Sequence, residues 1–325
     1  MALRLLQKNE KKISMRFGKS IAKILLPLLY KIFSFLKINR RAINFFSEKS
    51  FFSNDNHDFF NFISSLLKEK KIIALDVGAQ GGFNSDYFTP KKYDQFFEPI
   101  LIEPIKEEAE KLKKKNKKVI SNALWSSEVK KKIFILGNRL GSSSMYEPDP
   151  NLFSLHGIKK KDYLNYAVTD NVEVQCDTLS QSIKNLNINN LDYLKVDTQG
   201  AELEILKGIG DFRPLLIKIE THLHTMYKNV PSWNTLLDYL YKLNYTVVDW
   251  KGIGSHATRV PAEMDLILIP NFNNNAGNEI INNNEDKFVA LMLIFRQINL
   301  LKIISNKNNF KSSSQINDLD DFFFN

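Results

Sequence analysis

The chain is poor in cysteine, and this scarcity excludes several kinds of protein. Cys176 is the single cysteine among 325 residues. No disulfide can form within the chain, and no zinc cluster can be built from cysteines. We interpret Cys176, which lies in a strand-like stretch, as a buried apolar thiol rather than a nucleophile. The composition therefore fits a reducing compartment such as the cytoplasm.

Long apolar runs and a basic surface over the whole chain are also missing. The uncharged core of the most apolar N-terminal stretch, residues 24–30, is much shorter than the roughly 20 residues of a membrane span. The net charge is +9, but residues 1–50 hold twelve lysines and arginines and only two acids. The remainder is therefore close to neutral, and a nucleic-acid-binding face is not indicated.

The basic N-terminal region contains one candidate amphipathic helix. Residues 20–36 look like a secretory signal, but they lack a small-residue cleavage site. Lys19, Lys23 and Lys31 fall on one helical stripe, opposite the leucines and phenylalanines. Two interpretations stay open. Residues 19–37 either lie on an anionic membrane surface or form an extra helix packed on the domain, with the lysines in water.

Residues 71–270 alternate between strand-like and helix-like stretches, which is typical of an α/β domain with a mostly parallel sheet. Strands are predicted at residues 72–77, 100–103, 118–121, 133–136, 171–175, 193–196, 215–220, 246–250 and 265–269. Helices are predicted from Asn84 onward and at residues 105–115, 179–185, 201–207 and 233–243. We expect an N-terminal helical extension at 1–70 and a C-terminal region at 271–325. In that region an asparagine-rich linker, 271–284, precedes a helix at 287–304 and a polar tail.

A glycine-rich turn follows the first predicted strand. The apolar run of residues 72–77 contains Asp76, and Gly78 and Gly81 come directly after it. Glycines at such a turn let the backbone approach a ligand closely. The dinucleotide fingerprint, G-x-G-x-x-G with an acid about 20 residues further on, is absent, which disfavours a nicotinamide dehydrogenase. An acid before the glycines would repel a pyrophosphate. It suits a cofactor with a positive centre and an adenosine, such as S-adenosylmethionine (SAM).

The next two strand ends carry further polar residues. Glu103 closes the strand at 100–103, where a carboxylate can accept hydrogen bonds from ribose hydroxyls. Asn122 follows the third strand and could read the edge of an adenine, although asparagine there is commonly a turn residue. We predict that Asp76, Gly78, Gly81, Glu103 and Asn122 bind the cofactor.

Acids and histidines follow two later strands. Asp197 comes after the strand at 193–196, and the strand at 215–220 ends at Glu220, before His222 and His224. A histidine or Asp197 could take the proton of an acceptor hydroxyl. We predict Asp197, Glu220, His222 and His224 as catalytic residues and assign no metal ligand. A divalent ion on these side chains and a plain polar loop stay as alternatives.

Two motifs in particular resemble those of the FkbM family of SAM-dependent methyltransferases. They are DVGAQGG, residues 76–82, and LKVDTQGAE, residues 194–202; GSSSM at 141–145 and CDTL at 176–179 are also similar. The likeness covers about residues 72–270. It implies a class I (Rossmann-like) methyltransferase fold, with a mostly parallel seven-stranded sheet, helices on both faces and SAM at the carboxyl ends of the first strands. Gln199 departs from the family, which usually has an acid there.

The expected function is therefore SAM-dependent O-methylation of a hydroxyl. The resemblance implies a small-molecule or glycan acceptor, and we expect a sugar of a surface glycan. No nucleic-acid partner is expected, since the base-flipping Asn-Pro-Pro-Tyr type of motif is absent. The alternative is a non-catalytic protein of the same fold that docks at a membrane surface through its basic helix. Titration with SAM distinguishes the two.

Overall fold

The computed structural model describes residues 59–86, 88–253 and 261–319 of the chain. The basic segment at 19–37, and with it the predicted membrane contact, lies outside these residues. The described part of the chain begins just before helix α3 (Phe60–Leu67). None of the helices in the described ranges has both the length and the hydrophobicity to span a bilayer.

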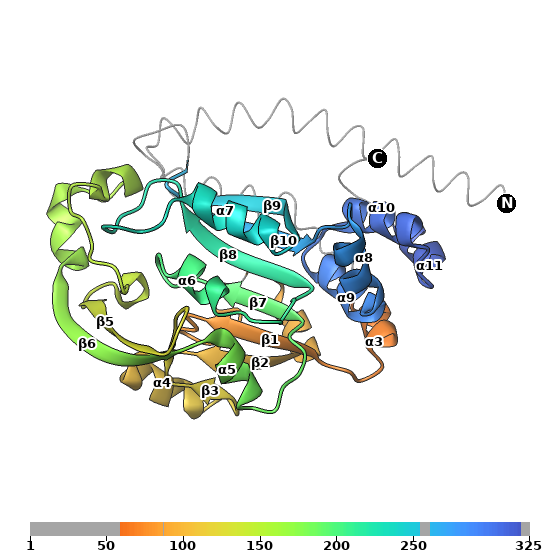
Figure 1. The fold of residues 1–325 in the computed structure, drawn as a ribbon, viewed down its shortest axis with the longest axis horizontal. Coiled ribbons are helices and arrows are strands. Elements are labelled where there is room, and N and C mark those ends of the chain that lie inside the picture. Colours follow the sequence, from red (N-terminus) through yellow and green to blue (C-terminus); the bar gives the residue numbers. More distant parts are fainter. Residues whose placement is uncertain (1–58, 87, 254–260, 320–325) are drawn as a thin grey trace, which may run out of the picture. The chain divides into compact units, whose positions relative to one another are not determined.

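Seven strands form one large sheet in the order β3-β2-β1-β7-β8-β10-β9 (Figure 1). Strands β3, β2, β1, β7 and β8 run parallel, whereas β10 pairs antiparallel with both β8 and β9. An α/β fold with a mostly parallel large sheet is thus confirmed. The strand order reverses direction between β1 and β7, and ligands of open α/β sheets bind at the carboxyl ends of strands beside such a reversal. The bounds are β1 (Ile72–Val77), β2 (Phe97–Ile102), β3 (Val119–Ile120), β7 (Tyr193–Val196), β8 (Leu216–His222), β9 (Tyr245–Ile253) and β10 (Glu263–Pro270).

Helices cover both faces of this sheet, because alternate residues of each strand point to opposite sides. On one side Ile72, Ala74 and Leu216 share a buried cluster with α3 and with α9 (Glu285–Ile294). We call this side the α9 face. On the other side Leu75, Val77 and their neighbours share a second cluster with α5 (Leu179–Lys184), α6 (Glu202–Lys207) and α7 (Trp233–Lys242). We call it the α6 face. Helix α4 (Lys106–Lys113) packs its Leu112 near Leu101 of β2.

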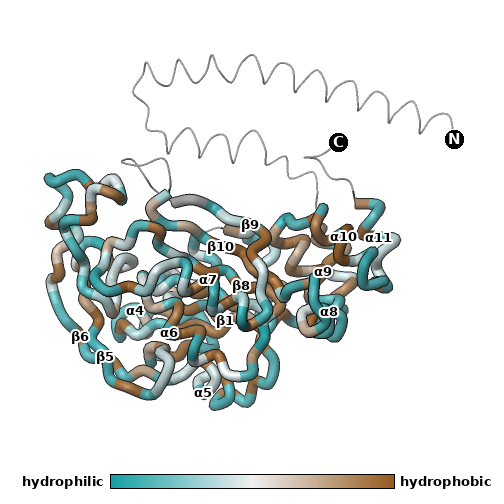
Figure 2. The backbone as a smooth tube through the Cα atoms, turned by 45° about the horizontal axis from the view of Figure 1, so that its top comes forward, coloured by the Kyte–Doolittle hydropathy of each residue, from teal (hydrophilic) through white to brown (hydrophobic). Residues whose placement is uncertain are grey.

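A second sheet of three strands stands apart from the large one. It has the order β4-β6-β5 and comprises β4 (Ala123–Leu124), β5 (Val129–Leu136) and β6 (Val168–Asp177). The strands predicted at 133–136 and 171–175 belong to this sheet and are longer than expected. Their side chains alternate between exposed and less exposed positions, and hydrophilic residues dominate β6 in Figure 2. Such alternation is typical of an antiparallel pair with one face in water.

The helix predicted from Asn84 onward is wrong. Asn84 has a φ of +52°, which is not helical. Its side-chain amide donates to the Thr89 carbonyl at 2.9 Å and to the Asp94 carboxylate at 2.8 Å. Local bonds of this kind compete with helix formation. The described residues form turns up to a 3₁₀ helix, η1 (Lys91–Phe96), which leads into β2.

The predicted asparagine-rich linker at 271–284 is also wrong, because it contains helix α8 (Asn275–Asn282). Asn274 caps this helix by accepting a hydrogen bond from the Gly277 amide at 2.8 Å, a role that asparagine fills well. The helix predicted at 287–304 is present as two helices, α9 and α10 (Ile298–Asn308), which are separated at Arg296 with a φ of +60°. A short α11 (Ser313–Asn317) follows.

Candidate functional site

The glycine turn after β1 brings two strand ends into close contact. The amides of Gly78 and Ala79 both donate to the Ile102 carbonyl of β2, at 3.2 and 3.1 Å. Gly78 has a φ of +81°, and a Cβ placed on it would lie 1.9 Å from the Asp197 carbonyl oxygen. No other residue fits this position. Gly78 therefore lets the ends of β1 and β7 meet at the point where the strand order reverses.

A cavity opens directly beside this turn. Its volume is about 670 Å³ when the open space at its mouth is included. Glu103, Asp197 and Gln199 contribute polar groups, and apolar side chains form most of the remaining wall. Strands β4 and β5 and the loop that follows β5 close one side. The apolar lining includes Ile102, Ile105, Leu124, Ile133, Leu140 and Met145.

Glu103 is the buried acid of this cavity. It lies directly after β2, is 4% exposed, and accepts a hydrogen bond from the Ile105 amide at 2.9 Å. Burial raises the pKa of its carboxyl group to about 7, because desolvation penalises the charged form. A ligand that donates hydrogen bonds to this carboxylate would replace the water that it has lost.

Asp76 lies on the α9 face and is not among the residues that line the cavity. It is fully buried, and the Lys195 ammonium on β7 lies 3.1 Å from its carboxylate. Burial raises the pKa of Asp76, and Lys195 opposes that effect. The nearby carboxylates of Asp76 and Asp197 raise the pKa of Lys195 despite its burial. The pair joins β1 to β7 just below the glycine turn, and direct contact of Asp76 with a cofactor stays a prediction.

Asp197 and the loop after it are held by a second buried acid. Glu202, at the start of α6, accepts hydrogen bonds from the amides of Thr198 and Gly200 at 2.9 and 3.1 Å. This network fixes the loop beside the cavity. The Asp197 side chain is 30% exposed and lies 3.7 Å from the Lys195 ammonium. It therefore contacts both the cavity and the charged residues of the α9 face.

Gln199, the departure from the family motif, links two carboxylates. Its amide nitrogen donates to Asp197 at 3.3 Å and also to Glu220, and its amide oxygen accepts from the Tyr227 hydroxyl at 2.9 Å. An acid at this position would be repelled by both neighbours, whereas an amide donates to them. The substitution thus has a local electrostatic reason.

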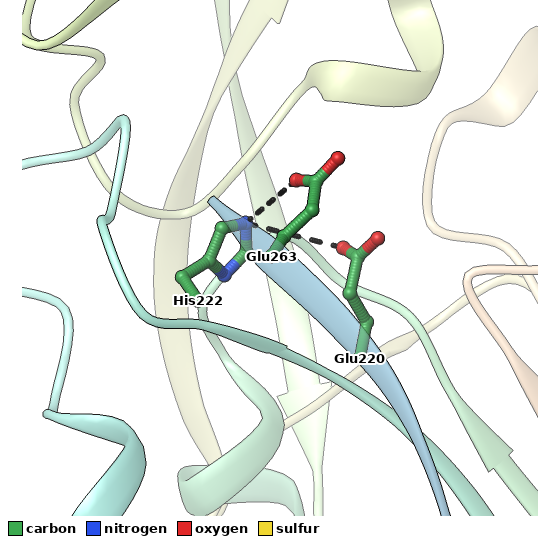
Figure 3. Close-up of side chains that lie close together, drawn as sticks. All are labelled: Glu220, His222 and Glu263. Atoms are coloured by element: carbon green, nitrogen blue, oxygen red, sulfur yellow. Dashed lines mark ion pairs between the residues drawn. The ribbon is translucent and has the colours of Figure 1, made fainter. Parts of the chain in front are cut away.

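Glu220 and His222 project from the same face of β8 and lie close together (Figure 3). The Nε2 atom of His222 is 4.0 Å from Glu220 and 3.5 Å from Glu263 on β10. Burial lowers the pKa of His222 to about 4, so the ring is neutral at pH 7. Burial and the surrounding acids raise the pKa of Glu220 well above its usual range. His224 lies beyond the end of β8 and outside this group, and its carbonyl accepts a hydrogen bond from His156 at 2.6 Å.

A comparison with protein families matches residues 76–247 to the methyltransferase FkbM domain. This segment runs from Asp76 into β9 and covers more than half of the chain. The chain belongs to the FkbM methyltransferase family. No curated protein matches the chain in a separate sequence search.

The FkbM segment contains every residue that lines the cavity, whereas Glu263 and helices α8–α11 lie beyond it. Of the predicted cofactor-binding residues, Gly78 and Glu103 line the cavity. Asp76, Gly81 and Asn122 do not, and the amide of Asn122 donates to Asp177 at 2.7 Å. Of the predicted catalytic residues, Asp197 lines the cavity, and Glu220 reaches it through Gln199.

Several polar residues on β8 and β10 were not predicted from the sequence as site residues. Lys218 is buried on β8 and pairs with Asp86 and, at 3.5 Å, with Asp265. Glu263 and Asp265 alternate with apolar residues along β10. Asp265 lies inside the strand predicted at 265–269, and the alternation of Glu263, Met264 and Asp265 would have extended that strand to Glu263.

Proposed function

We propose that this FkbM domain transfers a methyl group from SAM to a hydroxyl group of an acceptor. The observation that carries the proposal is the cavity at the ends of β1 and β2, between the glycine turn at Gly78 and the buried Glu103. Membership of a methyltransferase family supports the reaction type. The position beside the reversal of strand order supports the location of the ligand.

The residues of the cavity fit an adenosyl cofactor. Glu103 would accept hydrogen bonds from ribose hydroxyls, and the apolar wall around Ile105, Leu124 and Met145 would contact the adenine ring. The glycine turn would face the amino-acid end of SAM. A side chain at position 78 would have no room there. When bound, SAM supplies a methyl group made electrophilic by the sulfonium.

The chain itself would align the acceptor oxygen and remove its proton. Alignment of reacting groups can contribute on the order of 7–11 kcal/mol to lowering a barrier. Asp197 is the best placed of the predicted catalytic residues, because its carboxylate lines the cavity and remains partly exposed. His222, with a pKa of about 4, is a weak proton acceptor at neutral pH.

For the acceptor we propose a hydroxyl on a sugar, of a surface glycan or a related metabolite, in a cytoplasmic reaction. Acceptors of this class are common in the family implied by the motifs. Asp197 supports the idea, since its carboxylate lines the cavity, keeps some exposure and could accept hydrogen bonds from sugar hydroxyls.

Calorimetric titration with SAM tests the proposal. We expect saturable binding that S-adenosylhomocysteine competes for and that NAD and ATP do not. An undetectable interaction would favour the non-catalytic alternative instead. Mass spectrometry of cell-envelope sugars with and without the gene then identifies the acceptor, as loss of one O-methyl sugar would name it.

A further inference from the structure

A second group of donor atoms lies on the α9 face, next to the cavity but outside its lining. Glu220 and His222 are alternate residues of β8, and Glu263 stands directly opposite His222 on the antiparallel strand β10. Cross-strand neighbours on one face are close enough for their side chains to meet. One donor atom from each of the three side chains lies within 4.8 Å of the others. Figure 3 shows the three side chains gathered together.

His222 is the unusual member of this group. Its side chain is 1% exposed, and neither ring nitrogen has a hydrogen-bond partner among the described residues. A buried polar group without a partner destabilises the folded state, so such groups are rare and require an explanation. The Nε2 atom faces two carboxylates, at 4.0 Å from Glu220 and 3.5 Å from Glu263, so that all three side chains could bind one ion between them.

Glu220 adds a second unusual feature. It is 6% exposed, and its described neighbours include the carboxylates of Asp197 and Glu263. Within the described ranges no lysine or arginine pairs with Glu220, and the Gln199 amide donates a hydrogen bond to it. Buried carboxylates are normally paired with cations or coordinate metals.

We propose that Glu220, His222 and Glu263 bind one divalent transition-metal ion, of the Mn²⁺ or Zn²⁺ kind. One imidazole and two carboxylates suit these ions better than Ca²⁺ or Mg²⁺, which prefer oxygen ligands alone. Bonds to such an ion are about 2.0–2.2 Å long, which sets neighbouring donors roughly 3–4 Å apart. The separations of 3.5 and 4.0 Å from Nε2 of His222 to the two carboxylates match that spacing.

The ion would lie one side chain away from the cavity. Gln199 lines the cavity, and its side-chain amide donates hydrogen bonds to Glu220 and to Asp197. A coordination position that no protein donor fills could hold an acceptor hydroxyl near Asp197. Coordination to the ion would lower the pKa of that hydroxyl. This role rests on the proposed function, whereas binding of the ion does not.

Metal binding can be measured without cofactor or acceptor. Untagged full-length protein, stripped with a chelator, is titrated with Mn²⁺ and with Zn²⁺, and free Mn²⁺ is followed by electron paramagnetic resonance. We expect one saturable site, and at least a 100-fold loss of affinity in both His222→Ala and Glu220→Gln. Zinc-edge anomalous scattering from crystals should place the ion between the three side chains.

Two variants provide matched controls. His224→Ala removes a nearby histidine that lies outside the group, and Glu147→Gln removes an exposed carboxylate that pairs with Lys228. Both should bind the ion like the wild type. Thermal unfolding of the metal-free variants shows whether each one folds. Glu220→Gln, which replaces a buried carboxyl group by an amide of the same size, keeps the test valid if His222→Ala does not fold. The proposal is overturned if no site saturates at about 1 mM metal, or if folded Glu220→Gln binds as tightly as wild type. A normal SAM titration alongside either result would leave the proposed methyl transfer standing.

Discussion

At the scale of single residues, Gly78 has the most demanding position in the chain. Its φ is +81°, and a Cβ would meet the Asp197 carbonyl oxygen at 1.9 Å. Gly78→Ala should therefore separate the ends of β1 and β7 and abolish SAM binding in calorimetry. Gly82→Ala is the matched control, because Gly82 has a φ of +103° but the nearest atom to an added Cβ is 3.9 Å away. SAM affinity in Gly78→Ala equal to that of the wild type would contradict the role given to Gly78.

Glu103 gives a prediction that depends on pH. Its pKa is raised to about 7, so the carboxylate form, which accepts hydrogen bonds from ribose hydroxyls, becomes dominant as the pH rises through 7. SAM affinity should therefore increase between pH 6 and pH 8. Glu103→Gln should weaken binding roughly 10- to 100-fold, since hydrogen bonds to charged groups are worth about 1.5–3 kcal/mol. Because the variant keeps all other titrating groups, the difference between the two pH profiles isolates Glu103. Parallel profiles would count against the assignment.

Asp197 should matter for turnover rather than for cofactor affinity. Asp197→Asn keeps the size of the side chain but removes the proton acceptor, and general base catalysis contributes typically 10²- to 10⁴-fold. We expect kcat to fall by about that factor while the calorimetric affinity for SAM changes little. Single-turnover assays with labelled SAM would measure the chemical step. An unchanged kcat in Asp197→Asn would show that another residue acts as the general base.

The residues that the sequence identified were those at the tips of the strongest strands. Asp197 and Glu103 each end an apolar run, so their place at the carboxyl edge of the sheet followed from the pattern. Whether a side chain faces the cavity could not be predicted, because that depends on which side of the sheet the helices leave open. Asp76 illustrates this, since it lies on the α9 face with Lys195. Glu263 was missed because the strand predicted at 265–269 begins two residues after the start of β10.

At the scale of elements, the buried ion pair between β1 and β7 makes a testable contribution to stability. Lys195→Met removes the cation and leaves the carboxylate of Asp76 buried without it, which should destabilise the fold by about 3–5 kcal/mol in urea unfolding. The double variant Asp76→Asn with Lys195→Met removes both charges and should recover a large part of that loss. Lys113→Met, which affects an exposed pair with Glu110, should leave stability nearly unchanged. If Lys195→Met were as stable as Lys113→Met, the pair of Asp76 and Lys195 would not contribute to the stability of the fold.

Strand and helix positions were predictable where the hydrophobic pattern is strong. The bounds of β1 and β7 agree with the predicted 72–77 and 193–196, because both are mostly apolar runs followed by turn-forming residues, Gly78 after β1 and Asp197 after β7. Helices α4 to α7 also lie where the sequence placed them, to within two residues at each end. The helix predicted from Asn84 onward is absent because the Asn84 side chain forms hydrogen bonds with nearby residues. Hydrophobic periodicity does not reveal such bonds. Helix α8 was not predicted, because the asparagine-rich segment was interpreted as a linker. In the structure Asn274 caps the start of this helix.

At the scale of the whole molecule, the C-terminal helices belong to the same core as the sheet. Seven consecutive residues of α9, from Phe288 to Ile294, are buried, and they share a cluster with Ile72 and Leu216 of the sheet. A chain that ends after Asn284 would expose this cluster to water and should be recovered as aggregate rather than as soluble protein. A chain that ends after Leu319 retains α9–α11 and should behave like the wild type in size-exclusion chromatography. Soluble, SAM-binding protein from the shorter chain would instead support a self-sufficient domain at 71–270.

The measurement that tests the cofactor site most directly is a crystal structure of the protein with S-adenosylhomocysteine. We expect the ligand in the cavity beside Gly78, with its ribose hydroxyls within hydrogen-bond distance of the Glu103 carboxylate and its sulfur directed toward Asp197. Clear density for the ligand at any other place, with the cavity filled only by water, would contradict the assignment.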